Sequence, residues 1–174
     1  SFETRKVDIL IGTQMVSKGL DFDHVKVVGI MNADNMLNFP DFRSFERSFQ
    51  LMAQVSGRSG RKRGRGKVVI QTSNPENVVI KHVIANNYKD FFLQQMEERK
   101  IFRYPPYYRL VKLTIRHKIL DKVNKASGIL ADDLRKSLGN RITGPEFPLI
   151  SRVYNYHQKC IIVKIERNRE FGKR

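Results

Sequence analysis

The sequence predicts an α/β protein in two parts, a parallel sheet with its helices followed by a smaller α+β sandwich. Short apolar runs alternate with helical patterns in the first part, which is typical of strands that pair in parallel around helices. In the second part, strands with a period of two flank one long helical stripe. The consecutive prolines Pro105 and Pro106 exclude helix between these patterns. We therefore predict domains at residues 1–100 and 101–174.

Apolar runs and turn residues divide the first part into elements. The asparagine, aspartate and proline content of residues 32–40 predicts a loop, in which Asp34 is expected to be a turn or capping residue rather than a catalytic base. The order of the elements predicts a parallel sheet. The expected strands are residues 7–11, 25–31 and 67–72, and the expected helices begin near residue 76 and cover residues 88–100.

An amphipathic helix that starts after Asp41 organises the first part. Its apolar stripe, with spacings of three and four, predicts a face that packs on the core. A second stripe of planar polar side chains follows the same period. Such a face can be ordinary solvated surface, but the glycines and arginines that continue it favour a binding role. The apolar stripe is Phe42, Phe45, Phe49, Met52 and Val55, and the polar stripe is Arg43, Arg47, Gln50, Gln54 and Arg58.

Glycines and arginines follow directly at the end of this helix. Gly57 and Gly60 alternate with Arg58 and Arg61, so two guanidinium groups stand beside backbone that a ligand can approach closely. The planar fork of arginine suits phosphate because it makes two parallel charge-assisted hydrogen bonds. The pattern therefore indicates a phosphate site, with a solvated basic turn as the alternative.

The second part predicts an antiparallel sheet with one helix packed on it. Val111, Leu113 and Ile115 alternate with polar residues in a half-buried strand, and apolar residues of 123–138 trace one helix face. The half-buried strand covers residues 110–117. A loop is expected at 144–148 and further strands at 150–156 and 159–166, and the three strands form an incomplete sheet.

The charge points to a polyanionic partner. The formal net charge of +16 exceeds what solubility requires, although a ribosomal or merely basic protein would also carry it. An anionic membrane is a weaker candidate, because neither a long apolar run nor a signal peptide is visible. The single cysteine, Cys160, excludes a disulfide framework and a cysteine zinc site within the chain, which is consistent with a cytoplasmic protein.

Two ordered motifs resemble those of superfamily-two helicases. The stretch QVSGRSGR, residues 54–61, resembles their motif VI, and ILIGTQMVSKGLDF, residues 9–22, is similar to their motif V. The stretches DFRSFERSFQL at 41–51 and YPP at 104–106 narrow the resemblance to the PriA family of bacterial primosomal replication-restart helicases. The resemblance covers nearly the whole chain. It implies the C-terminal portion of a RecA-like helicase lobe followed by a truncated C-terminal domain.

The resemblance also implies roles for single residues. It implies that Arg61 and Arg58 act on the phosphates of ATP, one of them as the arginine finger, with Gln54 orienting neighbouring groups. It implies nucleotide contacts by Gly57, Gly60 and Asp21, and backbone contacts to DNA by Thr13 and Lys18. Of the basic run that follows, Lys62, Arg63 and Arg65 are expected to stay in solvent or to touch DNA phosphate.

The last hairpin is a second candidate for DNA contact. Its aromatic rings interleave with cations, an arrangement that suits single-stranded or branched DNA, although tyrosines packed on the sheet would give the same pattern. The resemblance implies a domain that helps to bind forked DNA, the single-stranded-DNA-binding protein and other primosome proteins. The hairpin residues are Arg152, Tyr154, Tyr156 and Lys159.

The chain lacks a P-loop and an acidic magnesium motif. ATP and Mg²⁺ are therefore expected in the full-length enzyme, while this chain alone is expected to bind neither tightly and to be inactive as an ATPase. The resemblance places the zinc module of the family upstream, so we assign no metal here, and it implies the bacterial cytoplasm and nucleoid. Two alternatives stay open: a non-enzymatic nucleic-acid-binding module, and another superfamily-two translocase acting on DNA or RNA.

Overall fold

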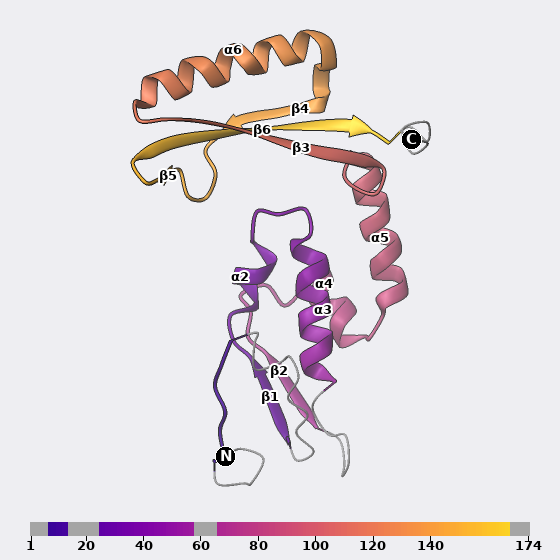
Figure 1. Cartoon of the computed structure of the whole chain (residues 1–174). Helices are drawn as coiled ribbons and strands as arrows, with labels where there is room; N and C mark the ends of the chain where they lie inside the picture. The colour runs from indigo at the N-terminus through magenta and orange to yellow at the C-terminus, as the bar shows by residue number, and fades with distance from the viewer. Residues whose placement is uncertain (1–6, 14–24, 58–65, 168–174) are drawn as a thin grey trace, which may run out of the picture. The chain divides into compact units, whose positions relative to one another are not determined.

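A computed structural model describes residues 7–13, 25–57 and 66–167 (Figure 1). The chain divides into two compact units, Ser1–Gln95 and Met96–Arg174, each of which is described by itself. The elements in chain order are β1 (Val27–Ile30), α2 (Ala33–Leu37), α3 (Ser44–Ser56), β2 (Lys67–Ile70), α4 (Val78–Ile84), α5 (Tyr88–Ile101), β3 (Tyr108–His117), α6 (Leu120–Leu138), the short 3₁₀ helix η1 (Gly139–Arg141), β4 (Ile142–Glu146), β5 (Arg152–Val153) and β6 (Tyr156–Glu166).

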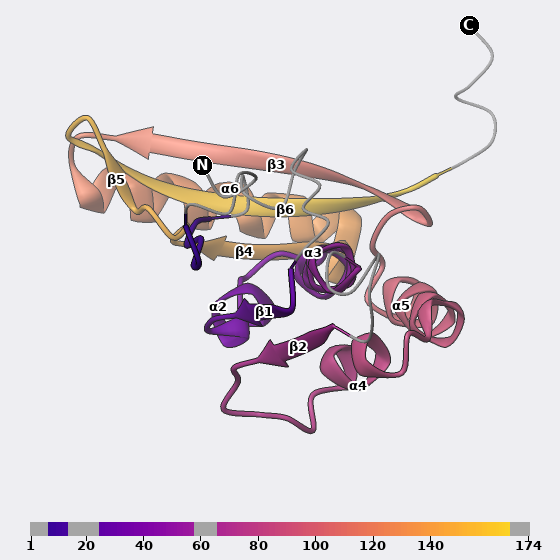
Figure 2. The ribbon, with the colours of Figure 1, turned by 90° about the horizontal axis from the view of Figure 1, so that it is seen from below.

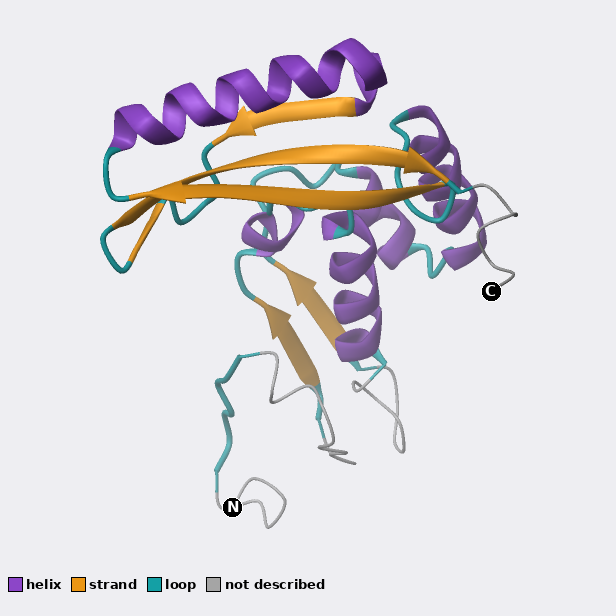
Figure 3. Ribbon diagram, turned by 45° about the horizontal axis from the view of Figure 1, so that its top comes forward, coloured by secondary structure: helices purple, strands orange, loops and turns teal. Residues whose placement is uncertain are grey.

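A parallel pair of strands forms the sheet of the first unit. β1 and β2 pair without a register shift, from Val27 opposite Lys67 to Ile30 opposite Ile70. The predicted strands at residues 25–31 and 67–72 and the predicted parallel sheet are thus confirmed. α3 runs in the opposite direction to both strands, so it ends where they begin (Figure 3).

α3 joins the helices of the first unit in one apolar core. Its side chains Phe49 and Met52 are buried, and the ring of Phe49 stacks on that of Phe91 in α5 with centroids 4.5 Å apart. Burying a side chain of this size stabilises the fold by about 1.5–3 kcal/mol. The polar stripe predicted on the other side is exposed at Arg43, Arg47, Gln50 and Gln54, and its last member, Arg58, lies outside the described residues. The buried core residues are Ala33, Leu37, Phe49, Met52, Val79, Ile80 and Phe91.

Two predictions in the first unit are wrong. Residues 7–11 do not form a strand, and Ile9 and Ile11 are 75% and 89% exposed, because none of the described residues pairs with this run. Residues 32–40 are not only loop, because α2 forms within them. Ala33 and Leu37 are one helical turn apart and both enter the core, so packing outweighs the turn-forming composition.

The ends of α4 and α5 share one backbone arrangement. Asn86 and Arg103, with φ of 49° and 58°, adopt the left-handed conformation just after α4 and α5. After α5, the N–H of Tyr104 donates to the carbonyl of Arg99 at 2.7 Å, which closes the helix as in a Schellman motif. The predicted helix at residues 88–100 is confirmed, and the chain turns out of it before β3.

An antiparallel sheet with one covering helix forms the second unit, as predicted. The strands lie in the order β3-β6-β4, with β5 paired to one end of β6, and α6 lies along one face of the sheet (Figures 1 and 2). Ala131 of α6 packs with Ile161 and Val163 of β6 and with Ile142 of β4. This apolar layer accounts for the period of two in β3, whose Leu113 and Ile115 pack against it.

Two boundaries in the second unit differ from the prediction. β4 reaches into the predicted loop at 144–148, where Gly144 allows a bulge beside β6. The predicted strand at 150–156 shrinks to β5, because Tyr154 and Asn155 both have positive φ and form a two-residue turn. Such a turn matches the twist of a hairpin, and it pairs Val153 with Tyr156.

The substitution Gly144→Ala should destabilise the second unit by about 2–4 kcal/mol in urea unfolding. Gly144 has φ of +97°, and a Cβ there would stand 2.6 Å from the carbonyl oxygen of Cys160. The matched control is Gly128→Ala in α6, where a Cβ meets nothing within 4 Å and should stabilise the helix by about 0.5–1 kcal/mol. Equal effects of the two substitutions would contradict this account of the bulge.

Candidate functional site

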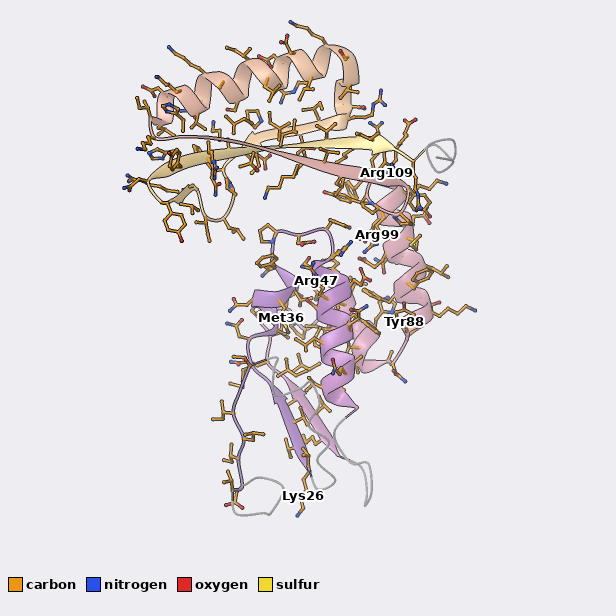
Figure 4. The ribbon with its side chains drawn as sticks, viewed as in Figure 1. Lys26, Met36, Arg47, Tyr88, Arg99 and Arg109 are labelled. Atoms are coloured by element: carbon orange, nitrogen blue, oxygen red, sulfur yellow. The ribbon has the colours of Figure 1, made fainter. Side chains whose placement is uncertain are left out.

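The two helicase-like motifs attach to the same end of the parallel pair. Residues 14–24 precede β1 and residues 58–65 join α3 to β2. The N–H of Lys67 donates to the carbonyl of Lys26 at 2.8 Å, so the chain enters β1 and β2 at adjacent points. Figure 4 shows Lys26 at this end, and α3 ends there as well. The residues that follow each motif therefore lie at the adjacent amino ends of β1 and β2.

Gln54 and Gly57 are the predicted motif VI residues that the structure describes. Gln54 lies on the exposed face of the last turns of α3. Gly57 caps the helix with φ of −66°, a value open to any residue. A Cβ on Gly57 would stand 3.5 Å from the carbonyl oxygen of Ala53, which is an ordinary contact. The helix itself therefore does not require glycine, which is consistent with a role in admitting a ligand close to the backbone.

The beginning of α3 uses its arginines locally. Arg47 forms an ion pair with Asp41 at 3.0 Å, and Asp41 also accepts the backbone N–H of Arg43 at 2.8 Å. The guanidinium of Arg43 lies 5.2 Å from the ring centroid of Phe42. Figure 4 shows Arg47 at the end of α3 remote from Lys26. These arginines thus stabilise the start of the helix. The N-cap of α3 is Arg43 rather than Asp41, which contributes to this start through its contacts with Arg43 and Arg47.

Asp34 braces the opposite ends of the strands. Its carboxylate accepts the hydroxyl of Thr72 at 2.5 Å and both the backbone N–H and the hydroxyl of Ser73 at 2.8 Å. These hydrogen bonds, that of Thr72 first, lower the pKa of Asp34 against a small opposing effect of burial. A carboxylate held ionised by three donors is a poor proton acceptor near neutral pH. Asp34 therefore acts as a brace between the segments that follow β1 and β2.

Of the remaining predicted site residues of the first unit, one lies within the described residues and the others do not. Thr13 is described and exposed, in a stretch without helix or strand. The others lie outside the described residues and stay predictions: Lys18, Asp21, Arg58, Gly60, Arg61, Lys62, Arg63 and Arg65.

The four predicted hairpin residues do not form one patch. Tyr154 stands at the turn and is 94% exposed, and Arg152 donates to the side chain of Asn155 at 3.2 Å. Lys159 lies 4.7 Å from the ring centroid of Phe147, whereas Tyr156 is an odd number of residues away along β6 and faces the other side of the sheet. The aromatic and cationic side chains that alternate along the sequence are thus separated in the folded hairpin.

Two cations that no local sequence pattern indicated lie beside the ring of Tyr156. Arg116 and Lys118 each lie 5.8 Å from the centroid of its ring, although they are far from it in the sequence. The available signal was the alternation of cations with apolar residues in β3. That alternation predicted a polar face on β3. Which strand pairs with β3, and therefore which ring lies beside its cations, is known only from the strand register of the structure.

Within residues 7–13, 25–57 and 66–167, no group of three or more histidine, cysteine, aspartate or glutamate side chains is arranged to hold a metal ion. In that same part of the chain, no helix has both the length and the apolar character that crossing a bilayer requires.

Comparison with known proteins defines the class first and then the family. Residues 1–63 match the helicase conserved C-terminal domain. The chain is similar to three proteins named replication restart protein PriA: 41% identical to that of Bacillus subtilis over 93% of this chain, 38% to that of Synechocystis over 94%, and 35% to that of Treponema pallidum over 94%. The chain belongs to this family. It spans 20% of the length of the first two relatives and 25% of the third.

Loss of the brace in Asp34→Asn should lower the urea midpoint at neutral pH. Because folding lowers the pKa of Asp34, its contribution is fully present above the ordinary value of 3.8 and is lost as pH falls through the folded value. The difference between wild type and variant should therefore stay constant from about pH 7 to about pH 5 and shrink as the pH falls below about 4. Glu97→Gln, at an exposed position of α5, serves as the control. A pH-independent difference would contradict the role of the charge.

Proposed function

We propose that this chain is the C-terminal part of an ATP-dependent DNA helicase that reloads the replisome at stalled or forked DNA. The observation that carries the proposal is the attachment of both helicase-like motifs at the adjacent starts of β1 and β2. A motor of this kind needs its nucleotide contacts and its DNA contacts on one rigid element. When that element closes around the nucleotide, it also moves along the DNA strand. Membership of the PriA family supports the same function.

In this proposal the arginines of motif VI face the phosphates of ATP. Arg58 and Arg61 supply planar, permanently charged donors, one of them as the arginine finger, and Gln54 orients the groups beside them. Gly57, Gly60 and Asp21 complete the nucleotide contacts. Bound Mg²⁺ would neutralise phosphate charge, and its ligands belong to the other lobe of the full-length enzyme.

DNA contacts come from two places in the proposal. Thr13 and Lys18 contact the strand on which the lobe moves, and the basic run Lys62, Arg63 and Arg65 adds phosphate contacts. In the second unit, Arg152, Tyr154, Tyr156 and Lys159 are further candidates, although they lie on different sides of the hairpin. The proposed partners are forked or single-stranded DNA, the single-stranded-DNA-binding protein and other primosome proteins, in the bacterial cytoplasm and nucleoid.

Net charge favours a second candidate, a basic nucleic-acid-binding module without enzymatic activity. The charge of +16 would serve such a module as well as it serves a motor. Another superfamily-two translocase would share the match to the helicase C-terminal domain. The arginine experiment below separates module from motor, and competition between DNA and RNA substrates separates the two kinds of translocase.

The isolated chain should not hydrolyse ATP in the presence of forked DNA. Phosphoryl transfer requires a P-loop and a metal-binding acid that this sequence does not contain. A turnover assay with the purified chain tests this, with the full-length protein as positive control. Robust hydrolysis that co-purifies with the chain would overturn the assignment of roles to the two lobes.

Arg58→Lys and Arg61→Lys, made in the full-length protein, should reduce ATP turnover. Removing an arginine finger costs on the order of 10³–10⁵ in rate. Lysine keeps the positive charge but lacks the planar fork that makes two hydrogen bonds to phosphate, so it does not replace the finger. Arg47→Lys is the matched control, since Arg47 pairs with Asp41 at the other end of α3. If both motif VI variants turn over ATP like the wild type, the chain is a binding module rather than part of a motor.

A further inference from the structure

The sheet of the second unit has one face that α6 does not cover. Leu113 in β3 pairs with Ile161 in β6, and both pack against α6. Because side chains alternate across a sheet, their sequence neighbours point to the other face. On β3 this uncovered face carries Lys112, Thr114 and Arg116, which are all exposed.

Cations stand beside aromatic rings at both ends of this uncovered face. At one end, Lys164 in β6 lies 4.3 Å from the ring centroid of Tyr104 and donates to the carbonyl of Phe102 at 2.7 Å. At the other end, Arg116 and Lys118 flank Tyr156. Tyr156 stays 38% exposed, so it is open to a further contact.

We propose that the uncovered face of the β3-β6 sheet binds single-stranded DNA, with phosphates at Lys112, Arg116 and Lys164 and a base stacked on Tyr156. The choice of DNA as the ligand rests on the proposed function. The new elements are the binding face, the preference for a single strand, and the contacts to phosphate and base. Charge complementarity identifies the occupant, because flat rings between cations match the alternation of bases and phosphates along a single strand.

The dimensions of this face suit a short extended strand. Lys164 pairs with Leu110 and Arg116 with Gln158, so the two cations are six residue steps apart along the sheet, roughly 20 Å. A DNA single strand of a few nucleotides covers such a length. A duplex would hide its bases from Tyr156 and could offer only its phosphates.

Other charges favour a path along β3 and β6. β3 is at the edge of the sheet, and Glu146 of β4 pairs with Cys160, which puts a carboxylate on the β4 side of this face. Partial burial, and then the positive charge of Arg103, lower the pKa of Lys164. An anion placed near Lys164 would relieve that repulsion, so the ammonium gains from a phosphate neighbour.

The test uses the 174-residue chain without nucleotide. Fluorescence anisotropy compares labelled oligo(dT) of about 15 nucleotides with a duplex of the same length. We expect the single strand to bind more tightly at matched salt. Tyr156→Leu should weaken that binding by roughly 5- to 100-fold while leaving duplex binding nearly unchanged, because only the stacked base is lost. Arg116→Gln should reduce the slope of log affinity against log salt by about 0.7.

Two matched controls remove the same chemistry elsewhere. Tyr88→Leu removes an exposed ring from α5 in the first unit, and Lys125→Gln removes a cation from the outer surface of α6. Both should bind oligo(dT) within about twofold of wild type by the same assay, apart from a small general effect of charge. Circular dichroism melting of each variant checks folding. Should Tyr156→Leu unfold, the exposed Arg116→Gln and Lys112→Gln carry the test.

Three results would overturn the inference: equal affinity for single strand and duplex, unchanged binding in Tyr156→Leu and Arg116→Gln, or an equal loss in Lys125→Gln. These outcomes are independent of the motor, because no ATP is present and the motif VI arginines are intact. Loss of turnover in Arg61→Lys together with normal Tyr156-dependent binding supports both proposals. Normal turnover in both Arg58→Lys and Arg61→Lys refutes the motor and leaves the single-strand site standing.

Discussion

The in-register pairing of β1 with β2 is the constraint on which the first unit depends. Hydrogen bonds run from Lys67 N–H to the Lys26 carbonyl at one end and from Gln71 N–H to the Ile30 carbonyl at the other. At the amino ends, this pairing holds the flanks of two helicase-like motifs together, and at the carboxyl ends Asp34 locks the segments that follow. A slip by one residue would turn every side chain of a strand to its other face and separate these flanks.

In the second unit, the packing of the sheet against α6 is the constraint that places the side chains. α6 covers one face of the sheet, so the alternation along β3 and β6 sorts every side chain into a core set and an uncovered set. Gly144 permits the bulge through which β4 joins this sheet, close to the carbonyl of Cys160. The cations of the uncovered face are thus placed by the same pairing that builds the apolar core.

In the proposed function, the two units offer different chemistry, one to a nucleotide and the other to a DNA strand. Arginine forks at the end of α3 suit terminal phosphates, where the direction of a hydrogen bond decides the strength of binding. A sheet face with aromatic rings suits bases, because stacking tolerates any sequence. In the proposed function, the first unit would convert nucleotide turnover into movement and the second would hold an unpaired strand.

The sequence by itself determined the class of fold, the strands β1, β2, β3 and β6, the long helices and the family, since these rest on local periodicity and on motifs that are contiguous in the chain. Only the tertiary structure decided that residues 7–11 form no strand, that α2 forms among turn residues, and that Lys159 and Tyr156 face opposite sides of a sheet. The physical reason is that pairing and burial depend on partners distant in the chain, such as Arg116 beside Tyr156, which no local pattern specifies.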